Sequence, residues 1–406
     1  MAIFVSSRYS STYPYPSSVH SFPRHFHRLH KAGMHDDIFA SLTLSRVSGV
    51  GPVVHRGLVH HFGSAAAVLR ASKRELCQVH GVSHKIADHI LAPTARREAE
   101  RIIEFAATHG IDVLCAGQPG YPANLHGFER APPVLYHRGG TDLGRQRMLA
   151  VVGTRRISKE AGRQIERLLD PLREYDPIIV SGLAYGIDTA AHRRSLSLGL
   201  STLAVMGSGL QYIYPYTNRR LAMDMCRQGG GLLTEYPHWV SPEREHFPAR
   251  NRIVAMLAEM TLVVESDRSG GSIITANMAH ELGRKVGACP GRGGDPATAG
   301  CNDLIRRGRA HLVDGAEDIV RLLGWEPDAP ARPQLQLFVS LPAGQQRVVD
   351  ALRKTADPLS VDQLLQQLGV PTAWLAGTLL ELEMQGIISA LPGQRYRLSA
   401  CGTGAA

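Results

Sequence analysis

The stretch VVESDRSGGSIITANMAHELGR, residues 263–284, decides the fold of this chain. It opens apolar and β-rich, becomes polar at Asp267, passes the pair Gly270-Gly271, and continues with the composition of a helix. A strand, a glycine turn and a helix start predict one βα unit of a parallel sheet. Glycines permit close approach of a backbone, and the free N–H groups of a first helical turn attract anions, so we expect a phosphate here. A βα connection without a ligand is the alternative, because glycine is common in turns.

Length, composition and charge narrow the class of protein. The 406 residues suggest two to four domains, and 44% hydrophobic with 20% charged residues is typical of a soluble globular protein. No apolar run approaches the ~20 residues of a membrane span. The net charge of +9 favours an acidic partner, nucleic acid first, although arginine outnumbers lysine 39 to 6, a bias that codon composition can produce. The six cysteines form no CxxC and no zinc-like cluster, so we expect no disulfide framework, no metal, and a reducing cytoplasm.

The N-terminal third divides into two segments. Residues 1–35 are rich in Ser, Tyr, Pro and His and contain no acidic residue. This predicts a disordered tail or a mis-assigned start, in which case Met34 is the true first residue. Residues 36–110 show helical periodicity, interrupted at 49–52 (GVGP) and 81–83 (GVS). This predicts a helix-hairpin-helix, SAM-like domain. Its glycine turns either contact DNA phosphates or serve only for packing.

The C-terminal part resembles a linker followed by a small domain. Residues 326–342 are proline-rich, and residues 343–400 show three helical patterns and two short strands, which predict a winged helix. Its third helix, 372–385, contains Glu381 and Glu383 and no Lys or Arg. Because such a helix repels phosphates, we expect a protein contact or a spacer role.

Residues 111–325 alternate strand and helix patterns, which predicts a doubly wound, Rossmann-like parallel sheet in an α/β domain. Its helices include 159–175 and 187–198. The expected strands are 148–154, 177–183, 201–209, 231–237, 260–267 and 285–291.

Ligands of open parallel sheets bind beyond the carboxyl ends of the strands. There the chain places small and hydroxyl residues, which together predict an extended anion-binding groove. The motif FPARNR, 247–252, adds two arginines, an asparagine and an aromatic ring just before a helix expected to start near Ile253, where cations would oppose the helix dipole unless an anion binds. The candidate groove residues are Gly153, Thr154, Arg155, Ser181, Gly182, Gly207, Ser208, Gly209, Thr234, Glu235, Phe247, Arg250, Asn251, Arg252, Gly270, Gly271, Ser272 and Thr275.

Several enzyme classes are disfavoured. The first βα turn reads GTRR rather than GxGxxG, and no GxxxxGK[ST] occurs, which argues against dinucleotide oxidoreductases and ATPases, and no cofactor is expected. A triple of Ser181, His192 and Asp188 is discounted, because a chain with 19 histidines offers such combinations by chance.

Six motifs in order resemble the DNA-processing protein DprA (Smf) family: GTR at 153–155, SGLAYGIDTAAH at 181–192, AVMGSGLQYIYP at 204–215, LLTEYP at 232–237, FPARNRIVA at 247–255, and SIITANMAHELGRKVGACPG at 272–291. The resemblance implies a Rossmann-like core that binds single-stranded DNA, usually as a homodimer. It further implies a mediator that hands incoming DNA to the recombinase RecA during natural transformation and is not an enzyme.

The resemblance also implies roles for single residues. Arg155, Arg250 and Arg252 become phosphate ligands, and Phe247 lies close to a base. Two departures stand out: Gly270-Gly271-Ser272 replaces the SGS of many relatives, and Tyr185 stands where some relatives have a basic residue. Tyr185 removes a charge but can stack on a base.

The main rival is an enzyme, because the core also resembles lysine-decarboxylase-like (LOG) nucleotide phosphoribohydrolases. Their Gly-Gly-x-Gly-Thr-x-x-Glu turn would place its glutamate at Asn277, and an amide cannot act as an acid or base. This hypothesis therefore depends on Glu235 or Glu281 substituting for it. A third hypothesis is a protein scaffold that acts through the winged helix.

Overall fold

The computed structural model describes residues 32–326, 342–355, 357–384, 387–391, 393 and 395–398. The chain divides into two compact units, Met1–Glu326 and Pro327–Ala406. The predicted tail at 1–35 and the predicted linker at 326–342 lie almost entirely outside the described residues.

A nine-stranded sheet forms the centre of the first unit, in the order β1-β2-β6-β5-β4-β3-β7-β8-β9. Neighbours from β6 to β9 are parallel, whereas β2 pairs antiparallel with both β1 and β6. This confirms the doubly wound, Rossmann-like class and all six predicted strands. The strands are β1 (Asp112–Cys115), β2 (Val134–Gly139), β3 (Met148–Val152), β4 (Ile178–Ser181), β5 (Thr202–Val205), β6 (Gly231–Thr234), β7 (Met260–Val263), β8 (Lys285–Ala288) and β9 (His311–Leu312).

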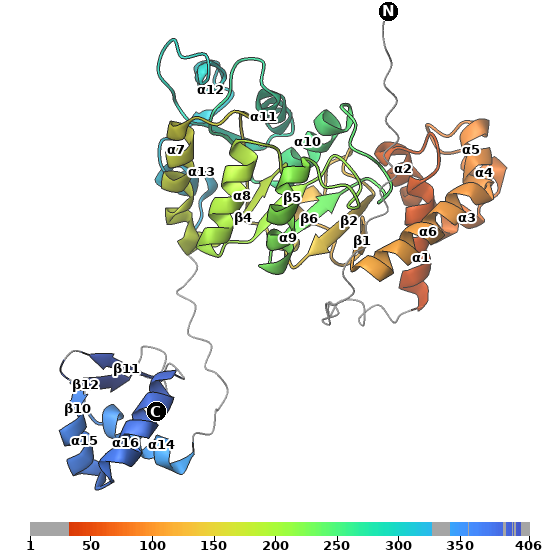
Figure 1. Cartoon of the computed structure of the whole chain (residues 1–406). Helices are drawn as coiled ribbons and strands as arrows, with labels where there is room; N and C mark the ends of the chain where they lie inside the picture. Colours follow the sequence, from red (N-terminus) through yellow and green to blue (C-terminus); the bar gives the residue numbers. More distant parts are fainter. Residues whose placement is uncertain are drawn as a thin grey trace, which may run out of the picture. The chain divides into compact units, whose positions relative to one another are not determined.

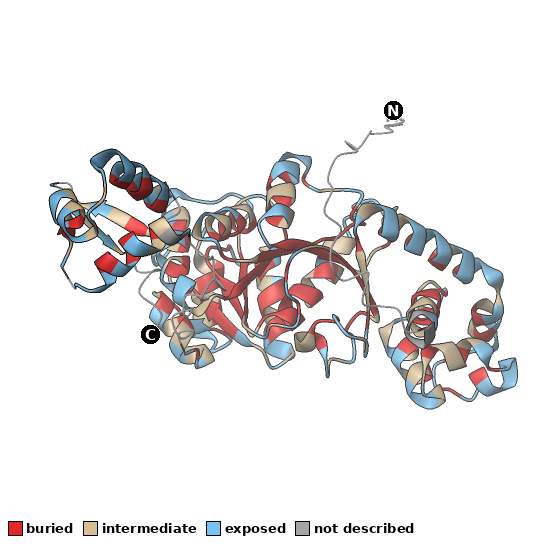
Figure 2. Ribbon diagram, turned by 90° about the horizontal axis from the view of Figure 1, so that it is seen from below, coloured by how far each residue is buried: buried red, intermediate tan, exposed pale blue. Residues whose placement is uncertain are grey.

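Helices cover both faces of the sheet, and Figure 1 shows α7, α8 and α9 side by side along one of them. Alternate residues of β3 enter two different cores: Leu149 and Val151 pack with α7, α8 and α13, while Met148 and Val152 pack with α10, α11 and α12. Strands β3 to β7 are therefore buried throughout, between helices with exposed outer faces (Figure 2). These helices are α7 (Lys159–Leu169), α8 (Ile187–Leu198), α9 (Arg219–Arg227), α10 (His246–Leu257), α11 (Gly271–Glu281), α12 (Ala299–Arg306) and α13 (Ala316–Leu323).

Six helices precede the sheet in the described part of the chain, and residues from all six contribute to a separate core. The two predicted turns hold Gly49 at φ 89° and Gly81 at φ 85°, a region that favours glycine. Helix α6 connects this part to the antiparallel edge of the sheet, because the Phe105 ring stacks on His238 with 3.7 Å between ring centres. The helices are α1 (Ala32–Ser45), α2 (Pro52–Phe62), α3 (Ala65–Arg70), α4 (Lys73–Leu76), α5 (His84–Leu91) and α6 (Pro93–His109).

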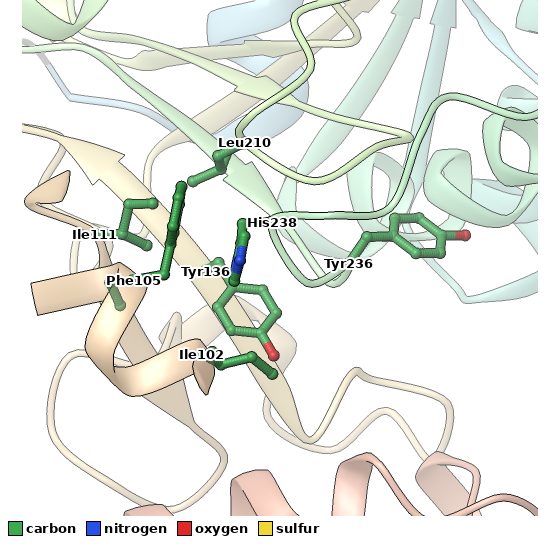
Figure 3. A pocket seen from close by; sticks show the side chains of 8 residues that line it. Ile102, Phe105, Ile111, Tyr136, Leu210, Tyr236 and His238 are labelled. Atoms are coloured by element: carbon green, nitrogen blue, oxygen red, sulfur yellow. The ribbon is translucent and has the colours of Figure 1, made fainter. Parts of the chain in front are cut away.

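A small apolar pocket lies at this connection, between α6, β2 and the loop that carries His238 (Figure 3). Phe105, Tyr136 and His238 contribute to its walls. Its volume of about 10 Å³ is at the limit for a single water, so it is not a site for an organic ligand.

The described residues of the second unit form three helices and a three-stranded sheet in the order β10-β12-β11, a winged-helix arrangement. Its core contains Leu352, Leu364, Leu375 and Leu382. The third helix, α16, exposes Leu380, 59% of which is accessible to solvent. The elements are α14 (Ala343–Arg353), β10 (Leu359–Ser360), α15 (Val361–Leu368), α16 (Thr372–Met384), β11 (Ile388–Leu391) and β12 (Arg395–Leu398).

Candidate nucleic-acid interface

The crevice of the sheet lies where β3 and β7 run side by side, because α7 leaves β3 toward one face and α11 leaves β7 toward the other. Glu265 fixes the GTR turn at this point. Its carbonyl accepts from the Thr154 N–H at 2.7 Å, and its carboxylate accepts from the Ser158 N–H at 3.0 Å. A Cβ on Gly153 would lie 2.5 Å from the Ile187 side chain, so the close packing of this turn requires glycine.

The GTR turn presents two exposed arginines. Neither Arg155 nor Arg156 forms an ion pair within the described ranges. The Arg155 guanidinium lies 5.9 Å from the centre of the Phe247 ring, and that ring lies 5.5 Å from Tyr214. A cation over an aromatic face combines a charge for a phosphate with a surface for a base.

The turn after β4 is held by buried polar groups. The Asp188 carboxylate accepts from the Gly182 N–H at 3.1 Å and the Ala184 N–H at 3.2 Å, and Asn218 donates to the Leu183 carbonyl at 2.9 Å. These bonds hold Leu183 at φ 62°, a strained conformation for a leucine. The backbone of this turn is therefore fixed before any ligand arrives.

Arg250 is only 5% exposed and supports this turn from beneath. Its Nη1 donates to the Val205 carbonyl at 2.8 Å, and a Cβ on Gly182 would lie 1.8 Å from that nitrogen. Burial lowers the pKa of Arg250 and raises the pKa of Asp188, and the attraction between the two charges opposes both shifts. Gly182 is thus required by the arginine packed against it.

Arg252 also has an internal partner, because it forms an ion pair with Glu235. Burial raises the pKa of this glutamate. The phosphate roles predicted for Arg250 and Arg252 remain predictions, and the contacts give both residues a structural role.

The prediction that a helix starts near Ile253 is wrong, because α10 begins at His246 and contains the whole FPARNR motif. Pro248 misled the prediction: it falls in the first helical turn, where the missing N–H costs nothing. Arg250 therefore lies in the second turn, and the proposed conflict with the helix dipole is weaker than expected.

The hydroxyls predicted to line the groove have internal partners. Ser181 donates to the Val151 carbonyl at 2.7 Å, and Ser208 donates to the Tyr212 carbonyl at 2.7 Å. Asn251 is half-buried. Two glycines serve close packing: an added Cβ would lie 3.3 Å from Phe247 at Gly207 and 2.0 Å from the Pro237 carbonyl at Gly209.

The glycine turn that precedes α11 presents backbone donors. Gly270 is the N-cap residue, and no side chain caps the first turn. Ser272 instead donates to the Ser266 hydroxyl at 2.7 Å, and Thr275 donates to the Gly271 carbonyl at 3.3 Å. The partial positive charge of this helix end is therefore left for an anion.

In the discounted triple, His192 has no hydrogen bond to Ser181 or to Asp188 among the described residues. Ser181 donates to a carbonyl, Asp188 accepts from backbone, and His192 is bonded through Nδ1 to Thr202 at 2.7 Å. Burial lowers the pKa of His192 to about 3, so it is neutral at physiological pH. This arrangement is not that of a nucleophile and its base.

Sequence reasoning missed Tyr212, Tyr214 and Tyr216, which are all exposed on the loop after β5. The signal was the alternation in YIYPY, residues 212–216. Among the described helices, none combines the length and apolar character that a membrane span needs.

Comparison with known proteins gives three domain matches. Residues 112–324 match the family DNA recombination-mediator protein A, 326–394 match the DprA winged helix domain, and 41–92 match the SAM-like helix-hairpin-helix tandem.

Individual relatives extend these matches over most of the chain. Protein Smf of Synechocystis is 30% identical over 88% of this chain and 97% of its own length, and Protein Smf of Escherichia coli is 35% identical over 74% and 84%. The crystal structure of DNA processing protein A (DprA) from Streptococcus pneumoniae is similar with a TM-score of 0.58 and 30% identity, covering 71% of this chain and 98% of that one.

Proposed function

We propose that this chain, which belongs to the DNA recombination-mediator protein A family, binds single-stranded DNA along the carboxyl edge of its sheet. The observation that carries the proposal is the exposed Arg155 beside Phe247, at the crevice between β3 and β7. The uncapped first turn of α11 follows β7 at the same crevice and offers backbone N–H groups to a second phosphate.

Binding depends on the charge of the DNA backbone rather than on recognition of the base sequence. Arg155 and Arg156 neutralise phosphates, and Phe247 offers a ring to a base, which only an unpaired strand can turn toward the protein. Hydrogen bonds to Glu265 hold the backbone of the turn that carries Arg155 and Arg156.

The wider role rests on family resemblance. We propose that the protein acts in the cytoplasm as a homodimer that protects incoming DNA and loads the recombinase RecA on it during natural transformation. Catalysis is not part of this role. The winged helix serves a protein contact rather than DNA, because the described part of α16 has no basic residue.

The phosphoribohydrolase alternative is not favoured. Glu235 is engaged in an ion pair with Arg252, and Asn277, at the position of the catalytic glutamate, accepts from Arg309 at 3.0 Å. Incubation with a nucleoside monophosphate should release no free base.

The test compares two variants with equal loss of charge. Arg155→Ala with Arg156→Ala removes the exposed pair, and Arg163→Ala with Arg167→Ala removes two exposed arginines from the outer face of α7. Fluorescence anisotropy with a labelled oligonucleotide across a salt series measures affinity and slope. The edge variant should bind weakly, with a slope smaller by about 0.7 per lost phosphate contact, and the α7 variant should resemble wild type. Equal affinities of the two variants would refute the proposed groove.

A further inference from the structure

The four most exposed tyrosines among the described residues lie on two loops at the carboxyl edge of the sheet. They are Tyr185 (47% exposed), Tyr212 (39%), Tyr214 (46%) and Tyr216 (65%), and we call them the tyrosine platform. Tyr185 follows β4, and the other three follow β5. Within 212–216 the tyrosines alternate with Ile213, which is half-buried, and Pro215, which is buried, so successive rings are turned outward.

Contacts join the two loops. The Thr217 hydroxyl donates to the Tyr185 hydroxyl at 3.2 Å, which places Tyr185 beside the residue that follows Tyr216. At the other end of the platform, the Tyr214 ring lies 5.5 Å from Phe247. The platform is therefore continuous with the ring that faces Arg155.

The backbone brings Tyr185 close to Arg155 as well. A Cβ on Gly186, the next residue, would lie 2.8 Å from the Arg155 Cα and 2.2 Å from the Thr154 carbonyl. The β4 loop thus packs directly on the GTR turn. Exposed arginines follow the platform at Arg219 and Arg220, so basic residues occur at both ends.

We propose that the tyrosine platform stacks successive bases of the DNA strand whose phosphates bind Arg155, an inference that rests on the proposed function. Aromatic faces flanked by cations suit a ligand that alternates flat rings with phosphates. A duplex keeps its bases stacked inside, so the platform contributes to single-strand binding alone. The platform thereby sets the preference for single strands, while the arginines supply charge without distinguishing strand type.

The experiment separates bases from backbone. Anisotropy measures binding of oligothymidylate and of an abasic tetrahydrofuran oligomer of the same length to wild type, to Tyr185→Ala with Tyr216→Ala, and to Tyr185→Phe with Tyr216→Phe. The alanine variant should lose about 5-fold to 150-fold in affinity for oligothymidylate per stacked base lost, with unchanged affinity for the abasic oligomer. The phenylalanine variant should bind both oligomers like wild type.

Two controls address folding and location. Trp374→Ala removes an exposed ring from the second unit and should leave both affinities unchanged. Crosslinking of wild type to an oligomer that carries 5-iododeoxyuridine, followed by peptide mass spectrometry, should recover peptides with platform tyrosines, and this readout needs no variant to fold.

The outcomes distinguish the two proposals. Equal losses on both oligomers, no loss in the alanine variant, or crosslinks only outside the platform would overturn the stacking role. Each of these results leaves the groove standing as long as Arg155→Ala with Arg156→Ala still weakens binding. Failure of wild type to bind either oligomer would overturn the proposed function itself.

Discussion

Charge reversal of the two FPARNR arginines, Arg250→Glu with Arg252→Glu, should unfold the first unit rather than merely remove phosphate contacts. Arg250 is 5% exposed and bonds to the Val205 carbonyl, and Arg252 pairs with Glu235. Arg250→Glu places a carboxylate near the buried Asp188, and Arg252→Glu places one beside Glu235.

The magnitude follows from these contacts. Breaking a buried ion pair by removing one partner costs about 3–5 kcal/mol. The side chains of Arg252 and Glu235 are 22% and 16% exposed, so screening by solvent favours the lower end, about 3 kcal/mol, for that pair. Arg250 is more deeply buried and faces Asp188, so its reversal costs about 3–5 kcal/mol. The total approaches the free energy of unfolding of a typical domain, about 5–15 kcal/mol.

The assay is urea unfolding followed by circular dichroism, with Arg155→Glu and Arg156→Glu as the matched control. That pair changes the net charge equally, but on exposed side chains. It should leave the free energy of unfolding nearly unchanged, within about 0.5 kcal/mol per site, while it abolishes DNA binding. The exchange Arg252→Glu with Glu235→Arg restores an ion pair and should recover part of the stability lost in Arg252→Glu. A double FPARNR variant with a wild-type midpoint would refute the structural role of both arginines.

Two further predictions concern stability. Gly182→Ala should destabilise the protein by about 1–3 kcal/mol in urea unfolding, because its Cβ would lie 1.8 Å from Arg250 Nη1. Gly293→Ala, in an exposed loop, should be nearly neutral, because its Cβ would meet nothing within 4 Å. Equal effects of the two substitutions would contradict the packing argument. Burial lowers the pKa of His55 to about 4 and that of His192 to about 3. Below pH 6.5 the unfolded chain therefore binds protons that the folded chain excludes. Each histidine should lower the free energy of unfolding by about 2 kcal/mol between pH 7 and pH 5. A smaller pH dependence in His55→Gln checks this, and an unchanged one would argue against burial of a neutral imidazole.

The strands that were predicted are those whose burial is written in local composition. Met148–Val152 is apolar throughout because both faces of β3 are covered, and this pattern needs no knowledge of the neighbours. Strand β2 contains His137 and Arg138, and β1 begins at Asp112, so neither shows a continuous apolar run. Strand β9 has two residues, and only its pairing with β8 defines it. The formation of these three strands depends on tertiary contacts rather than on local composition.

The candidate site, too, could be predicted from the sequence only in part. The motifs identified the correct edge of the sheet, because strand ends and glycine turns are local features. The motifs could not show that Arg155 is exposed and Arg250 is buried, because both are arginines in motifs. Arg250 is buried only because α10 packs against the turn after β4. The platform tyrosines carried a visible alternation, but their exposure depends on which way the β5 loop faces.

This division between buried and exposed charge has a consequence for binding. The turns after β4 and β5 are held by hydrogen bonds between backbone groups and the side chains of Asp188, Asn218 and Arg250. A ligand does not have to break these bonds in order to bind. Among the described residues, Arg155 forms no ion pair and no side chain caps the first turn of α11. A strand of DNA therefore meets a preformed surface and has little protein ordering to overcome, so most of the entropic cost of binding falls on the DNA itself. A surface of this kind favours flexible single strands of any sequence, since it selects for bases that can turn outward rather than for their identity.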